Sequence, residues 1–217
     1  MATPGARATG VGVLDKAVSV LDAVETRPMS TSELARALAM TMSTTHRLTG
    51  ALQAHELLRR DADGRFHLGP RFATAPLLET AGPALEALRD DTGESVQLWV
   101  RRGTQRMCAV SVESREELRT ALPVGSFLDL PDGSAGQVLV GAPIPPGQGW
   151  LESSGTRTPG IASVSAPVYH HGEIVAALCL SGPLQRLAPS PGALHGSRVR
   201  DAARHVEAAT WGSAAAD

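Results

Sequence analysis

The residues best suited to chemistry lie near the start of the chain. Ser43, Thr44 and Arg47 fall close together in a segment with helical character. Short hydroxyls and a guanidinium group at the beginning of a helix are typical contacts to phosphates and base edges in a DNA major groove. The positive end of the helix dipole also attracts a phosphate there. We therefore expect these three side chains to belong to a helix that reads DNA.

Two further helices are needed to hold such a reading helix. Apolar residues recur at helical spacing over residues 12–25, which predicts a first amphipathic helix. Ser30 and Glu33 have the spacing of a capping box, so a second helix should run from about residue 31 to residue 39. The apolar positions of the first helix are Val13, Leu14, Ala17, Val18, Leu21 and Val24.

The reading helix is the third in order. Thr41 or Ser43 can cap it, and it should reach about His55. One of its faces is apolar enough to pack against the first two helices, which leaves the hydroxyls and the arginine on the opposite face. The expected inward residues are Thr45, Leu48 and Leu52.

A basic hairpin should follow the third helix. Two strand-like runs, residues 57–60 and 65–68, flank an Asp-Gly turn at residues 61–64. Arg59 and Arg65 should lie at its edge, where they can contact the DNA backbone. Three helices and a hairpin predict a winged helix-turn-helix, although a scaffold for protein contacts stays open as an alternative.

The length and composition of the chain limit the number of domains and the class of protein. A chain of 217 residues suggests one large domain or two small ones, and 42% hydrophobic residues are ordinary for a globular protein. The net charge is −2, but residues 1–72 hold nine basic against seven acidic residues. No apolar run approaches the roughly 20 residues that cross a bilayer. With a polar tail at residues 1–10 and two distant cysteines, we expect a cytoplasmic protein.

The second half of the chain predicts an α+β domain built on an antiparallel sheet. Residues 70–80 should form a linker, in which Pro76 argues against a single long helix. A helix ending at Gly93 should follow, and a C-terminal helix should cover residues 194–209 and bury Leu194. The expected strands are residues 95–100, 106–112, 118–122, 162–169 and 174–181.

The N-terminal motifs resemble those of the IclR-type bacterial transcription regulators. The residues that match the start of the family's reading helix are Ser43, Thr44, His46, Arg47 and Leu48, and those that match the end of its wing are Gly64, Arg65, Phe66, Leu68 and Gly69. The chain is most similar to an actinobacterial subgroup that regulates leucine and related amino-acid biosynthesis genes.

This resemblance implies a domain arrangement and partners. It implies a winged helix-turn-helix over residues 11–69 and a GAF-like effector-binding domain over residues 81–217. The expected partners are a double-stranded DNA operator and a second copy of the chain, in a homodimer or a tetramer. The implied DNA contacts are Ser43, Thr44, His46, Arg47, Arg59 and Arg65.

A ligand pocket on one side of the sheet is also implied, for a small carboxylate or an amino-acid-related effector. Small residues at a helix start can leave backbone N–H groups for a carboxylate. Residues 141–160 are shorter than in the family and rich in Pro and Gly, so we expect an irregular segment. The pocket could therefore be open, covered by a partner chain or without a ligand. The implied contacts are Gly133, Ser134, Ala135, Ser163, Cys179 and Ser181.

Other chemistries have little support in the sequence. Cys108 lies in a strand pattern with no base placed beside it, so we expect a buried apolar side chain and no enzyme. His170 and His171 are adjacent and lack the spacing of a helical metal pair. We expect no metal and no cofactor. The main alternative to a DNA-binding regulator is a GAF-like sensor or protein-interaction module without productive DNA binding.

Overall fold

The structure is a computed structural model that describes residues 9–212. Contacts divide the chain into two units between Phe72 and Ala73. We call residues up to Phe72 the first unit and residues from Ala73 the second unit, and we describe each by itself. The division falls within the predicted linker of residues 70–80. Most of the predicted tail, and the last five residues of the predicted second domain, lie outside the described residues.

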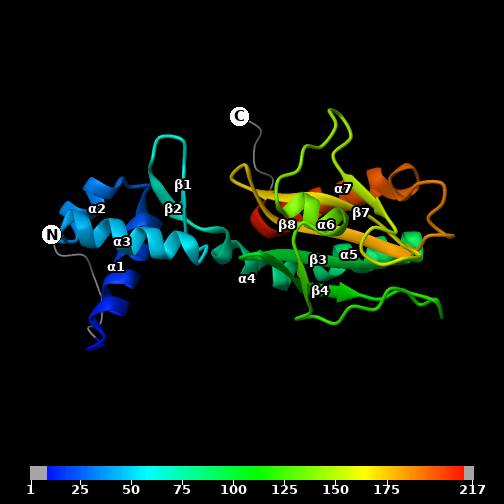
Figure 1. Cartoon of the computed structure of the whole chain (residues 1–217), viewed down its shortest axis with the longest axis horizontal. Helices are drawn as coiled ribbons and strands as arrows, with labels where there is room; N and C mark the ends of the chain where they lie inside the picture. Colours follow the sequence, from blue (N-terminus) through cyan, green and yellow to red (C-terminus); the bar gives the residue numbers. More distant parts are fainter. Residues whose placement is uncertain (1–8, 213–217) are drawn as a thin grey trace. The chain divides into compact units, whose positions relative to one another are not determined.

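The first unit contains three helices and a hairpin in the predicted order (Figure 1, blue to cyan). Its elements are α1 (Gly12–Thr26), α2 (Thr31–Ala37), α3 (Met42–Ala54), β1 (Leu58–Arg60) and β2 (Phe66–Leu68). The capping box is confirmed, because the Ser30 hydroxyl accepts from the Glu33 N–H and the Glu33 carboxylate accepts from the Ser30 N–H. Of the two predicted caps for α3, Thr41 is the one that accepts, from the N–H of Thr44 at 3.2 Å.

A small apolar core joins these elements. Met29 exchanges backbone hydrogen bonds with Phe66, at 3.2 and 2.8 Å, and so attaches the hairpin to the segment before α2. Gly69 closes the hairpin by donating to Leu57 O, and a Cβ at this position would collide with Glu56 O. The fully buried members are Val20, Val24, Met29, Leu34, Leu52, Leu58 and Phe66.

The prediction for the first helix was wrong in part. Val13, Leu14 and Val18 are exposed, whereas Val20 and Val24 are buried. The reason is that α1 enters the core only through its second half, where it meets α3 and β2. Helical periodicity alone does not show how much of a helix has a neighbour.

The expectation that Pro76 would prevent a single helix in the linker was also wrong. Helix α4 (Pro70–Thr80) is continuous and contains Pro76. Proline cannot donate to Phe72 O four residues earlier, at a typical cost of about 3 kcal/mol in a helix interior. Burial of Ala73 and Leu77 in the core of the second unit offsets this cost.

The second unit is a six-stranded antiparallel sheet covered on both faces, which confirms the α+β class. The strands lie in the order β5-β4-β3-β8-β7-β6. After α4, its elements are α5 (Gly82–Thr92), β3 (Ser95–Arg102), β4 (Gln105–Val112), β5 (Phe127–Asp129), α6 (Gly133–Leu139), β6 (Leu151–Ser154), β7 (Ile161–His170), β8 (Glu173–Pro183) and α7 (Pro191–Trp211).

Strand β3 lies in the middle of the sheet and is buried on both sides. Val96, Leu98 and Val100 point to the larger core, which also contains residues of α5 and α7. Trp99 points to the other face and packs with Ala135 of α6. Helices α6 and α7 therefore lie on opposite faces of the sheet (Figure 1). Strand residues that line a cavity beneath α6 therefore alternate, along each strand, with residues that point to the larger core.

Three further expectations for the second unit need correction. Residues 118–122 form no strand, because the Leu118 carbonyl accepts a hydrogen bond from the Arg186 side chain instead of from a sheet neighbour. The segment 141–160 is not irregular throughout, since β6 lies within it. Leu194 is exposed, because it lies outside the face of α7 that packs on the sheet through Val199, Ala203 and Val206.

No helix among residues 9–212 is both long enough and apolar enough to cross a membrane.

Candidate nucleic-acid interface and serine-lined cavity

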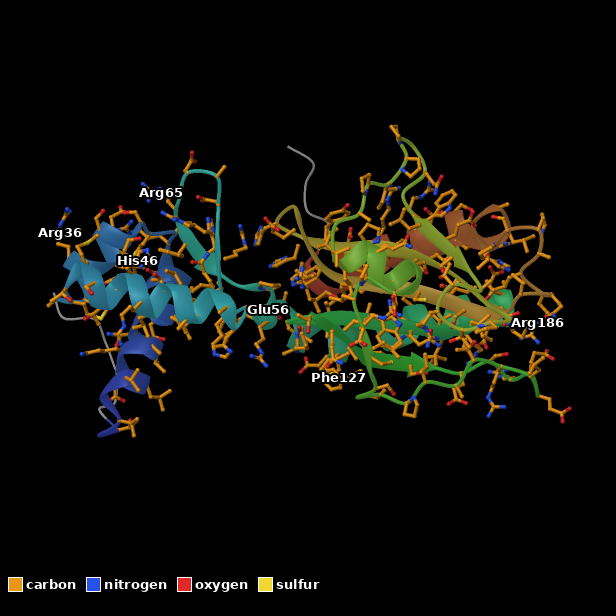
Figure 2. All side chains as sticks on the ribbon, viewed as in Figure 1. Arg36, His46, Glu56, Arg65, Phe127 and Arg186 are labelled. Carbon is orange, nitrogen blue, oxygen red and sulfur yellow. The ribbon has the colours of Figure 1, made fainter. Side chains whose placement is uncertain are left out.

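Helix α3 presents most of its predicted DNA contacts to the surface. Ser43, His46 and Arg47 are exposed, and Figure 2 shows His46 on this helix. Thr44 is half-buried, and its hydroxyl oxygen accepts from the Thr41 hydroxyl at 2.9 Å. The Thr44 hydroxyl proton remains available to a ligand oxygen. Thr45 is buried on the opposite face, as predicted.

The Arg47 guanidinium makes no hydrogen bond or ion pair within residues 9–212. It lines an open groove of about 460 Å³ together with Thr44 and Leu48 of α3 and Lys16 of α1. Lys16 was not among the predicted contacts. The position of α1 beside α3 depends on tertiary packing, so no local pattern in the sequence indicates that Lys16 and Arg47 share a groove.

The hairpin from Leu58 to Leu68, which we call the wing, is held by its own polar side chains. The Arg60 Nε donates to Gly64 O at 3.0 Å, and its guanidinium lies 5.5 Å from the centre of the Phe66 ring. Asp61 accepts from the Arg65 N–H at 2.8 Å and contacts His67 Nε2 at 2.7 Å. These contacts lower the pKa of Asp61, chiefly through His67. The wing is thus an ordered loop with a fixed turn.

Arg65 has a second role that the sequence did not indicate. Its Nη1 donates to the Glu33 carboxylate at 3.1 Å and to Pro28 O at 3.2 Å, although the side chain remains 45% exposed (Figure 2). Glu33 caps α2 at the same time. The Ser30 N–H and hydroxyl, followed by Arg27 and Arg65, lower the pKa of Glu33 to about 2. Arg65 therefore connects the wing to the start of α2. Arg59, on β1, is half-buried.

In the second unit, a cavity of about 30 Å³ lies between α6 and the sheet. We call it the serine-lined cavity. All six residues predicted to contact an effector line it: Gly133, Ser134, Ala135, Ser163, Cys179 and Ser181. These residues come from α6, β7 and β8, so the fold brings together the positions that the family motifs indicate.

The serine hydroxyls are connected to one another. The Ser134 oxygen lies 2.8 Å from the hydroxyl oxygens of both Ser163 and Ser165. The Ser181 hydroxyl donates to Gln97 Oε1 at 3.1 Å. These bonds fix the side chains around the cavity without a bound molecule.

Two buried polar residues of this cavity were missed. Arg106 of β4 is 3% exposed, its guanidinium lies 4.9 Å from the centre of the Trp99 ring, and its Nη1 donates to Asp132 O. Burial, the largest cause, lowers the pKa of Arg106. Its Nε and the Nε2 of Gln97 are buried without hydrogen-bond partners. Alternation along β4 could have predicted that Arg106 lies on the α6 face of the sheet. It could not have predicted the distance between Arg106 and α6.

Neither cysteine has the features of a nucleophile. Burial raises the pKa of the Cys108 thiol to about 11 and also raises the pKa of the Cys179 thiol. A thiol with a raised pKa holds little thiolate near neutral pH. Among residues 9–212, no three histidine, cysteine or acidic side chains gather in a way that could hold a metal ion.

Two family models match the chain, one to each unit. The IclR helix-turn-helix domain matches residues 13–62, and the bacterial transcriptional regulator IclR C-terminal domain matches residues 72–143. Together they cover more than half of the sequence. The first match contains α1, α2 and α3, and the second contains α6 and the start of the sheet.

Curated relatives and solved structures agree with these matches. The HTH-type transcriptional repressor AllR of Salmonella typhimurium is 25% identical and aligns with 92% of this chain and 90% of its own length. The HTH-type transcriptional regulator BhcR of Paracoccus denitrificans is 25% identical over 91% of this chain and 86% of its own.

Among solved structures, an IclR-family regulator from Rhodococcus sp. is 27% identical, with a TM-score of 0.56 and coverage of 96% of this chain and 97% of that one. An IclR homologue from Microbacterium hydrocarbonoxydans has the same fold, with 22% identity, a TM-score of 0.55 and coverage of 93% and 100%. The matching families and relatives are transcriptional regulators and not enzymes. The chain belongs to the IclR family of DNA-binding transcriptional regulators.

Proposed function

We propose that this regulator binds its operator by placing α3 in the major groove of double-stranded DNA. The observation that carries this proposal is Arg47, an exposed guanidinium without a partner in the described residues, on a helix whose start is fixed by the Thr41 cap. Arginine can make two hydrogen bonds to one guanine, which gives sequence discrimination. Ser43, Thr44 and His46 lie on the same helix and complete the proposed contact surface.

The wing supplies the proposed backbone contacts. Only Nη1 of Arg65 is used by Glu33 and Pro28, so its other N–H groups are available to a phosphate. Arg59 is the second proposed phosphate contact. Contacts of this kind hold the protein on DNA of any sequence, whereas Arg47 selects the sequence.

The chain acts in this proposal as a homodimer or a tetramer. Helix-turn-helix proteins commonly bind two half-sites whose symmetry matches that of the protein. The proposed target genes are those of amino-acid biosynthesis, in line with the resemblance of the N-terminal motifs.

The second unit, which we interpret as GAF-like, is proposed to bind a small carboxylate or amino-acid-related effector in the serine-lined cavity. The six predicted contacts share one cavity, and its lining also includes Arg106 and Gln97, each of which has a buried N–H group without a partner. The Microbacterium homologue is described in complex with 4-hydroxybenzoate. That likeness establishes the fold alone, so the proposal rests on the side chains of this chain. An effector would change DNA binding only if it bound two arrangements of the protein with different affinity.

The test is a gel-shift assay with the full chain. The probes are the DNA upstream of its own gene, the DNA upstream of neighbouring and amino-acid biosynthesis genes, and a random sequence of equal length. We expect at least one upstream probe to bind about a thousandfold more tightly than random DNA, with an affinity that falls steeply with salt. Equal binding to every probe would contradict sequence-specific recognition. A shift only with DNA outside biosynthetic loci would contradict the proposed target genes.

A further inference from the structure

The serine-lined cavity has an unbalanced charge. Two guanidinium groups, those of Arg106 and Arg157, line it, and no carboxylate lines it among the described residues. Arg106 makes no ion pair, and the positive charge of Arg157 further lowers its pKa. Cys179, the largest opposing cause, and Asp132, whose carboxylate is exposed and does not line the cavity, raise this pKa. Two positive charges side by side in a partly buried site favour a negatively charged ligand.

The cavity also offers donors with no acceptor. The Arg106 Nε–H and the Gln97 Nε2 amide are buried and without partners. The Gln97 amide is held in one orientation because the Ser181 hydroxyl donates to its Oε1. A buried donor without an acceptor costs about 1 to 3 kcal/mol, which a ligand oxygen would recover. The ligand atoms that enter here should therefore be oxygen acceptors.

The serine cluster adds one further donor. Three hydroxyls, those of Ser134, Ser163 and Ser165, bring three protons, and the two contacts at Ser134 use two of them. The third hydroxyl proton can go to the sulfur of Cys179, which is hydrogen-bonded to Ser134 and Ser165, or to a ligand oxygen. The donors around the cavity thus come from β3, β4 and the α6–β7 contact.

The size of the cavity limits what can enter. Its volume of about 30 Å³ is enough for roughly two water molecules, or for the two oxygens of one carboxylate. The rest of a ligand must extend to the mouth of the cavity. Arg157, which is half-buried in the turn between β6 and β7, lines the same cavity and can reach a second anionic group there.

We propose that the serine-lined cavity binds a short dicarboxylate, with one carboxylate on Arg106 and Gln97 and the other on Arg157. This inference deepens the proposed function and rests on it. It also selects between the two effector classes proposed above. The ammonium group of an amino acid would face two guanidinium groups with no cavity-lining carboxylate to balance its charge, so a dicarboxylate is favoured over an amino acid.

The test is isothermal titration calorimetry of the full chain with malonate and succinate, compared with acetate and glycine. We expect at least one dicarboxylate to bind about tenfold or more tightly than acetate, and glycine to bind no better than acetate. Arg157→Gln should remove most of the dicarboxylate preference and weaken acetate binding much less than dicarboxylate binding. Arg101→Gln removes an exposed arginine of the same sheet and should change neither affinity.

Arg106→Gln should weaken the binding of every carboxylate. A change at this buried residue can affect folding, so Ser181→Ala is a second variant that tests the same carboxylate site. It removes the hydroxyl that holds the Gln97 amide in place. Ser181→Ala should weaken acetate and dicarboxylates by the same factor, with a tryptophan fluorescence spectrum like that of the unchanged chain.

Equal affinity for acetate and both dicarboxylates, or a dicarboxylate preference that survives Arg157→Gln, would overturn the inference. Absence of binding by all four compounds would also overturn it. A gel shift on the same preparation separates this failure from failure of the proposed function. Operator binding without dicarboxylate binding contradicts only the dicarboxylate inference. Dicarboxylate binding without operator binding contradicts the DNA-binding proposal.

Discussion

Arg47 in the first unit and Arg106 in the second are both arginines without an ion pair in the described structure, but their surroundings are opposite. Arg47 is exposed on a helix and keeps its guanidinium in solvent. Arg106 is 3% exposed and lies over Trp99. A solvated arginine costs little to keep unpaired, whereas a buried one is costly unless something compensates it. The first arrangement suits a large, polyanionic partner that approaches from outside, and the second suits a small anion that enters the protein.

The two units also differ in how far along the chain their polar contacts reach. In the first unit, caps and turn contacts connect residues a few positions apart, as Ser30 and Glu33 do. In the second unit, Glu94 pairs with Arg186 across most of the domain. The first unit forms many of its polar contacts within local segments, although Arg65 reaches Glu33 across 32 positions, whereas the buried ion pair of the second unit needs the complete sheet.

The largest expected effect tests this dependence on distant contacts. Glu94 has a side chain 4% exposed and accepts two hydrogen bonds from Arg186, at 2.6 and 2.8 Å (Figure 2 labels Arg186). Glu94→Gln removes the charge and leaves Arg186 unpaired. We expect the second unit to lose about 2 to 3 kcal/mol in its free energy of unfolding, less than for a fully buried pair because Arg186 is 34% exposed.

Urea unfolding followed by tryptophan fluorescence measures this loss in the second unit alone, because Trp99, Trp150 and Trp211 all lie there. The matched control is Asp91→Asn, which removes an exposed partner of Arg198. An exposed pair should contribute at most about 0.5 kcal/mol. Equal losses in the two variants would show that burial of Glu94 adds nothing to the contribution of this distant ion pair.

The same contrast explains what the sequence could predict. Capping residues, an Asp-Gly turn and helical spacing act over a few positions, so the elements of the first unit and the cap at Thr41 could be predicted closely. The family motifs also indicated six of the residues that line the cavity. Arg106 and Gln97 could not be predicted there, because their roles depend on strand pairing and on α6 crossing the sheet. The exposed half of α1 was missed for a similar reason.

The second prediction concerns the exposed arginine. Arg47→Lys keeps the positive charge but removes the planar pair of N–H groups that can bind one guanine. We expect the affinity for the operator to fall about tenfold, with unchanged affinity for random DNA and an unchanged salt slope. Gel shifts at several salt concentrations measure all three quantities. Arg36→Lys, at an exposed arginine of α2, is the control (Figure 2). A uniform loss on operator and random DNA would show that Arg47 contacts only phosphate.

A smaller effect is expected at the wing, where an arginine has both an internal and a proposed external partner. Arg65→Ala should weaken binding to operator and random DNA alike by about threefold and reduce the salt slope by about one. Glu33→Gln keeps an oxygen for the Ser30 N–H and keeps Arg65, but removes the ion pair. It should therefore leave the salt slope unchanged. A slope that is unchanged in Arg65→Ala as well would limit Arg65 to anchoring the wing.

The smallest expected effect is a pH dependence that belongs to the first unit. The folded pKa of Glu33 is about 2, against 4.5 for the free side chain, because Ser30, Arg27 and Arg65 favour the carboxylate. A lowered folded pKa contributes stability that is fully present well above pH 4.5 and is lost as the pH falls toward 2. Amide hydrogen exchange of α2 measures this local stability without involving the tryptophans of the second unit. At neutral pH, α2 should exchange faster in Glu33→Gln than in the unchanged chain, and the two rates should converge as the carboxylate is protonated. A difference that persists at about pH 2 would show that the Glu33 charge does not stabilise the junction between the wing and α2.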